Sequence, residues 1–241
     1  HVPGTSQPQF LRRGLLGCRC RDARLEMSVS WSEKVMASLD GRAQILQTAR
    51  GDAQVAREGQ GPKVLVSHGG PGGSDLGLAW ARHLRDGGCE LIAPSRPGYL
   101  RTPLESGRSP ESQADLFAAI LDVLDIERVS VLGFSAGAPA AVHFAARHPD
   151  RTKALLLDAA ILFPFEPPIS AAQRATYESG TLVWLSYQMV TRWPALLTGF
   201  MINGVSNGLT PHQKEAAVKW ITSDPARLHN FQEQFTCTAP A

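Results

Sequence analysis

Between residues 43 and 160, short apolar runs alternate with segments of helical periodicity, and this alternation restricts the fold more than any other feature. Four of the runs are typical of buried strands, because each is brief, mainly apolar and flanked by polar residues, glycine or proline. They are residues 63–69, 90–95, 128–133 and 153–160. Two further strands are expected before them, joined by a hairpin turn at Gly51–Asp52.

Helical segments separate these strands. The clearest begins at Ser109, a serine N-cap, with Pro110 at the first helical position and an apolar face of period 3.6 after it. Two others are expected at Asp75–Leu84 and from residue 137 to the stop at Pro149. The alternation predicts an α/β fold, a mostly parallel doubly wound sheet with flanking helices.

The segments on either side of this core differ from it in character. Residues 1–26 hold five arginines against two acidic residues and show no periodicity, so we expect a disordered or non-native extension. Residues 27–162 form the expected core. Residues 163–241 contain helix and loop patterns without strands, which indicates a helical cap or lid over the core.

Composition excludes several classes of partner. The net charge of +2 does not favour nucleic acid, and no charge-free apolar run of 18 residues would cross a membrane. Cys18, Cys20, Cys89 and Cys237 have no further ligands at metal-site spacing, so we interpret them as free thiols in a reducing, cytoplasmic compartment. We expect neither a metal nor a cofactor.

Ser135 is the candidate nucleophile. It stands in the string GFSAG (133–137), between an apolar strand and a helix, where a sharp turn would present its hydroxyl at the carboxyl edge of the sheet. The alternative is an ordinary serine N-cap in a strand–helix turn.

The string SHGGPGG (67–73) follows another strand and offers backbone N–H groups that could bind an oxyanion. Ala136 N–H should supply one donor. Gly70 should supply the other, with Gly69 as second choice, because Pro71 has no N–H. We interpret His68 as a residue that orients this loop.

Four strings together carry a resemblance: VLVSHGGPGG, LIAPSRPGYLRTPL, SVLGFSAGAPAAVHFAARHPDR and KALLLDAA. In that order and spacing they resemble the α/β-hydrolase superfamily, over residues 43–160. The HGGPG string is also similar to proline iminopeptidases, which usually carry a bulkier residue after the serine. Ala136 fits esterases and carbon–carbon bond hydrolases at least as well.

The resemblance implies an acid and then a histidine after the serine, and the sequence supplies neither in the usual pattern. Asp158, at the end of the sixth strand, is a candidate acid, because some related hydrolases place it there. His229, five residues after Asp224, is the late candidate base, and a solvated surface histidine is its alternative interpretation. We therefore expect a truncated chain whose sixth strand is an exposed edge open to self-association.

The predicted function is a serine hydrolase that cleaves carboxylic esters or related acyl compounds through an acyl-enzyme on Ser135. Aromatic and methionine residues of the cap region suggest a hydrophobic substrate group or, alternatively, plain packing: Trp184, Tyr187, Met189, Trp193, Phe200 and Met201. One rival is a proline-iminopeptidase-type aminopeptidase using Glu166 or Glu178. Another is a non-catalytic ligand-binding protein on the same scaffold.

Overall fold

The computed structural model describes residues 41–163, 179–193 and 208–236, and in addition residues 33, 37, 195–196, 198–199 and 202. Several predictions concern positions outside the described residues, namely residues 1–26, Cys18, Cys20, Cys237, Glu166, Glu178, Phe200 and Met201.

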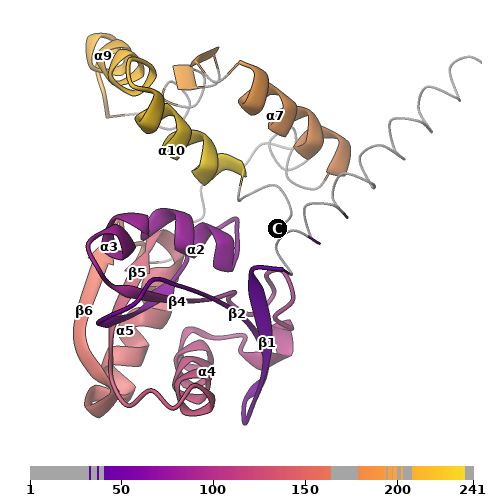
Figure 1. Cartoon of the computed structure of the whole chain (residues 1–241), viewed down its shortest axis with the longest axis vertical. Coiled ribbons are helices and arrows are strands. Elements are labelled where there is room, and N and C mark those ends of the chain that lie inside the picture. Colours follow the sequence, from indigo (N-terminus) through magenta and orange to yellow (C-terminus); the bar gives the residue numbers. More distant parts are fainter. Residues whose placement is uncertain are drawn as a thin grey trace, which may run out of the picture.

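The centre of the described chain is a six-stranded sheet in the order β1-β2-β4-β3-β5-β6 (Figure 1). β3, β4, β5 and β6 run parallel to one another, while β1 and β2 form an antiparallel hairpin whose β2 pairs antiparallel with β4. The strand bounds are β1 Ala43–Thr48, β2 Gly51–Glu58, β3 Lys63–Ser67, β4 Glu90–Pro94, β5 Val129–Phe134 and β6 Thr152–Asp158. The predicted mostly parallel sheet is confirmed.

Helices cover both faces of the sheet, as a doubly wound sheet requires (Figure 1). Their bounds are α2 Ser74–Trp80, α3 Arg82–Asp86, α4 Pro110–Val123 and α5 Ala138–Arg147, with short 3₁₀ turns η1 Leu104–Ser106, η2 Ser135–Gly137 and η3 Pro149–Arg151. Side chains alternate along each strand, so the sheet separates two cores. Val131 and Leu65 pack with α4 and α5, whereas Leu132 and Val66 pack with α2.

Two local predictions were wrong. The hairpin turn was expected at Gly51–Asp52 but lies at Ala49–Arg50, and Gly51 already pairs with Thr48 in the β1–β2 ladder. The Thr48 hydroxyl accepts a hydrogen bond of 3.0 Å from Arg50 N–H, which closes the turn before the glycine. The single helix expected at 75–84 is two helices, α2 and α3, which meet at Ala81. The helix after Ser109 is confirmed, with a capping box between Ser109 and Ser112.

After the sheet, the described ranges include the helices α7 Gly180–Arg192, α9 Pro211–Thr222 and α10 Pro225–Thr236. α10 contacts α7, α9 and α2 (Figure 1). Arg82, at the start of α3, ties α10 to the core through a salt bridge with Glu233 and a hydrogen bond to Asn230 Oδ1 at 2.5 Å. Of these helices, α10 therefore lies against the α2 side of the core, and α7 and α9 pack on α10.

β6 is an edge strand in the described part of the chain. Leu155 and Leu157 remain 39% and 44% exposed, in contrast to the buried apolar residues of β5. The expected exposed edge at the sixth strand is thus present, while self-association through it stays a prediction.

Candidate active site

Ser135 occupies a strained turn at the carboxyl end of β5. Its φ is +49°, a left-handed conformation that a serine adopts only where the surrounding structure imposes it. Two flanking glycines allow the turn. A Cβ on Gly133 would lie 2.6 Å from Ala141 Cβ, and a Cβ on Gly137 would lie 2.2 Å from the Ser67 carbonyl oxygen. The GFSAG string therefore reflects close packing of α5 on β3 and β5, which fixes Ser135.

The loop after β3 lies beside this turn. A Cβ built on Gly69 would be 3.0 Å from Ser135 Cβ, so the Gly69 backbone approaches the serine as closely as a glycine permits. Gly70 and Ala136 are exposed, and Ser135 is half-buried. Ala136 lies in the first turn that leads into α5, where N–H groups have no intrahelical acceptor. The two expected oxyanion donors and the serine thus share one edge of the sheet.

His68 is fully buried beneath this loop. The Arg96 N–H donates to His68 Nε2 at 2.8 Å, and His68 Nδ1 lies 2.6 Å from the Gly69 carbonyl oxygen. Because a backbone N–H can only donate, Nε2 is the acceptor and Nδ1 carries the proton. Desolvation, assisted by the charge of Arg96, lowers the pKa of His68 to about 3. A neutral histidine with both nitrogens engaged orients the loop, as expected from the sequence.

The loop after β4 completes the edge. Tyr99 lies edge-on to the His68 ring at 5.1 Å between centroids, and a Cβ on Gly70 would be 3.0 Å from Tyr99 Oη. The Arg96 guanidinium is 5.0 Å from the centre of the Tyr99 ring. Burial lowers the pKa of Arg96, which the nearby Tyr99 hydroxyl partly opposes. A cation and a phenol therefore lie directly against the glycine loop.

Asp158 is the register partner of Phe134, the residue before the serine. Its Oδ2 accepts a hydrogen bond of 2.8 Å from the Trp80 indole N–H, and Trp80 stacks on Phe134 at 4.6 Å. The segment that leaves β6 also contacts the turn, because Ile161 N–H donates to the Ser135 carbonyl at 3.1 Å. The candidate acid thus lies one strand away from the serine, with one oxygen still without a hydrogen bond in the described structure.

The structure does not bring His229 to Ser135 by any hydrogen bond within the described residues. His229 is exposed on α10. Asp224, the carboxylate five residues before it, instead caps α10 by accepting from Ala226 N–H at 2.8 Å and pairs with Arg227.

Other histidines of the core are engaged elsewhere. His148 contacts Asp115 at 3.0 Å and His143 lies 3.4 Å from Glu111, both contacts joining α5 to α4. The Ser135 hydroxyl itself makes no hydrogen bond in the described part of the chain, so no described base is in contact with it.

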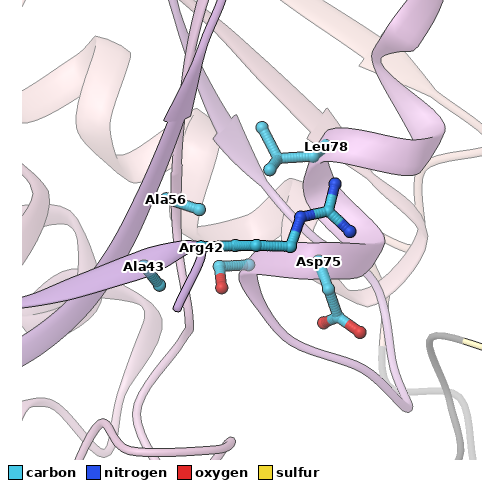
Figure 2. A pocket seen from close by; sticks show the side chains of 6 residues that line it. Arg42, Ala43, Ala56, Asp75 and Leu78 are labelled. Carbon is cyan, nitrogen blue, oxygen red and sulfur yellow. The ribbon is translucent and has the colours of Figure 1, made fainter. Parts of the chain in front are cut away.

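A small hollow of about 10 Å³ lies between the start of β1 and α2, enough for about one water molecule (Figure 2). Arg42, Asp75 and Leu78 line it, and neither Ser135 nor Gly70 does. Among the residues described, no three His, Cys, Asp or Glu side chains converge as a metal site would require. No helix in the described ranges has the length and apolar character to cross a bilayer. Cys89 is a free thiol.

Sequence reasoning gave no role to Trp80, Arg96 or Tyr99. Arg96 and Tyr99 could have been found, because β3 and β4 are parallel neighbours whose following loops must meet at the carboxyl edge. Trp80 carried no signal, since an indole in a short amphipathic helix is typical of packing alone. Of the aromatic residues after 163, Trp184 is half-buried on α7 and Trp193 is 58% exposed, while the Tyr187 side chain lies outside the description.

Comparison with known proteins gives consistent matches. A family model described as the alpha/beta hydrolase fold matches residues 62–189. The solved structure of an alpha/beta hydrolase fold protein from Nakamurella multipartita is 36% identical, with a TM-score of 0.75, and the match covers 82% of this chain and 68% of that one.

Two curated relatives match nearly half of this chain. An uncharacterized hydrolase of Bacillus subtilis, YcgS, is 36% identical over 111 residues, 46% of this chain and 39% of the relative. Epoxide hydrolase 3 of Siraitia grosvenorii is 36% identical over 123 residues, 48% of this chain and 37% of the relative. The chain therefore spans about two fifths of the length of these relatives.

Proposed function

The chain belongs to the family of proteins with the alpha/beta hydrolase fold, and we propose that it is a serine hydrolase that cleaves carboxylic esters or related acyl compounds through an acyl-enzyme on Ser135. One observation carries the proposal. Ser135 has a φ of +49° at the end of β5, with the Gly69 backbone directly against its Cβ. A strained backbone conformation of this kind is typical of functional side chains such as the nucleophile of a strand–helix turn, whereas a serine that only caps a helix does not require it.

In the proposed reaction, the Ser135 oxygen attacks the acyl carbon and its proton passes to a base. The carbonyl oxygen gains negative charge, which the N–H groups of Ala136 and Gly70 bind, with Gly69 as the alternative donor. Expulsion of the alcohol leaves the acyl group on Ser135, and water then releases it. Donors of this type typically contribute 10²- to 10³-fold each to kcat.

For the orienting acid we propose Asp158. The Trp80 indole N–H holds one carboxylate oxygen, which fixes the carboxylate while the other oxygen stays available to a histidine. His229 is the candidate base from the described helices, and replacement by alanine tests it. If His229 is the base, His229→Ala should lower kcat by at least 10³-fold.

We propose that α7, α9 and α10 form a cap over the site and favour a hydrophobic acyl or alcohol group. Exposed apolar side chains on and after α7 support this choice, including Leu185 at 47%, Trp193 at 58% and Leu196 at 65% exposure. The expected substrates are therefore esters with medium apolar chains.

A fluorophosphonate probe tests the nucleophile directly, because it phosphonylates only an activated serine. The wild-type protein should be labelled at Ser135, and Ser135→Ala should not be labelled. Ser223→Ala, which removes an exposed serine after α9, is the matched control and should label as the wild type does. A folded wild-type protein that fails to label contradicts the proposal and favours a non-catalytic binding protein.

A substrate panel then separates the two enzymatic interpretations. Hydrolysis of p-nitrophenyl esters with an optimum at medium chain length supports the esterase assignment. Hydrolysis of proline anilides without ester preference would instead assign an aminopeptidase of the iminopeptidase type.

A further inference from the structure

The peptide between Gly69 and Gly70 is held from one side by two donors. Its carbonyl oxygen lies 2.6 Å from His68 Nδ1–H and 3.4 Å from Arg96 Nη2. This peptide is trans, so its carbonyl and its N–H point in opposite directions. Donors that fix the Gly69 carbonyl therefore also fix the direction of the Gly70 N–H, the donor assigned to the oxyanion.

Arg96 is an unusual residue to find at this position. Its side chain is 7% exposed, it forms no ion pair within the described residues, and its Nε has no hydrogen-bond partner there. The groups that face it are the ring and hydroxyl of Tyr99, the neutral His68 and the Gly69 carbonyl. Burial of a cation without a counter-charge is unfavourable, so a packing role alone does not explain the guanidinium.

The missing counter-charge would arise during the reaction. An oxyanion held by Gly70 N–H places negative charge on the far side of the peptide whose carbonyl faces Arg96. A cation in a poorly solvated position stabilises such charge more strongly than a solvated cation does. Hydrogen bonds to the carbonyl also polarise the peptide and strengthen its N–H as a donor.

We propose that Arg96 is a positioning residue for the oxyanion site, which with neutral His68 locks the Gly69–Gly70 peptide so that the Gly70 N–H faces the reaction centre. The inference rests on the proposed serine hydrolase function for its kinetic consequence. Its structural content, the orientation of one peptide, is independent of turnover. Tyr99 packs over the guanidinium and keeps it against the loop.

Kinetics on a p-nitrophenyl ester measure the first consequence. Arg96→Gln should lower kcat about 10²-fold, as loss of one oxyanion donor does, with KM within threefold of the wild-type value. Arg96→Lys keeps the charge but loses the planar donors, and should recover part of this loss. Arg108→Gln removes an exposed arginine, paired with the exposed Glu105, further along the connection from β4 to α4; it is the control and should change kcat less than twofold.

Nuclear magnetic resonance of ¹⁵N-labelled protein measures the second consequence without any substrate. In Arg96→Gln the Gly70 amide resonance should shift and broaden, while amides of α4 should keep their positions and so report an intact fold. Should Arg96→Gln fail to fold, Arg96→Lys is compared in the same way, with a smaller shift expected.

The two measurements distinguish the two possible failures. An unmoved Gly70 amide in a folded Arg96 variant overturns this inference, and so does a rise in KM with kcat unchanged. Absence of fluorophosphonate labelling in the wild type would refute the serine hydrolase function alone, and the Gly70 resonance would still decide the orientation of the peptide.

Discussion

Acidification should destabilise this protein through His68, and the loss should begin near pH 6.5, above the range in which ordinary carboxylates titrate. His68 is completely buried, and desolvation together with the charge of Arg96 lowers its pKa to about 3. In the unfolded chain the same imidazole has a pKa of about 6.5. Between these two values the unfolded chain binds a proton that the folded protein excludes.

The sign and the size follow from proton linkage. Because the folded pKa is depressed, the stability contribution is fully present above pH 6.5 and is lost as the pH falls towards 3. The free energy of unfolding should fall by about 1.4 kcal/mol for each pH unit in this window. Acidification from pH 6.5 to pH 5 should therefore remove about 2 kcal/mol, a large share of the 5–15 kcal/mol that stabilises an ordinary domain.

Urea unfolding at several values between about pH 7.5 and pH 5, followed by circular dichroism, measures the effect. His68→Gln is the matched control, since its side-chain oxygen can still accept from the Arg96 N–H and it does not titrate. The wild type should lose about 2 kcal/mol more than this variant between pH 6.5 and 5. Parallel pH profiles for the two proteins would refute the assignment of His68 as a buried neutral imidazole.

Three further predictions concern the frame around the serine. Gly137→Ala should prevent stable folding or lower the free energy of unfolding by about 3 kcal/mol or more, because its Cβ would overlap the Ser67 carbonyl. Thermal melting measures this loss of stability, and an unchanged melting midpoint would contradict the packing argument. Trp80→Phe keeps an aromatic ring but removes the hydrogen bond to Asp158. If Asp158 is the acid that orients the base, kcat should fall about tenfold, and an unchanged kcat would exclude that role for Asp158. Leu157→Lys on the exposed edge of β6 should reduce concentration-dependent association in sedimentation velocity, and a wild type that stays monomeric at every concentration would show that the edge does not pair.

The sequence alone determined the architecture of the core, because the signals involved are local. Strand runs and helix periods identify themselves within a few residues, and β6 ends at Asp158 in the structure, within the run 153–160 predicted for it. The string around Ser135 also identified the sharp turn, since only small neighbours fit between β5 and α5. The hairpin at Ala49–Arg50 was misplaced because the Thr48 side chain, not the glycine, closes the turn.

Only the tertiary structure decided the electrostatic character of the site. The partners of His68 and Asp158 lie 28 and 78 residues away in the sequence. His68 meets Arg96 because β3 and β4 are neighbours in the sheet, and Asp158 meets Trp80 because Trp80 of α2 stacks on Phe134, the register partner of Asp158. Whether His68 is neutral, and whether Arg96 has a counter-charge, depends on burial and on which loops share one sheet edge. Periodicity carries no information about either, since it specifies which face of an element is buried and not which side chain from another element meets it there.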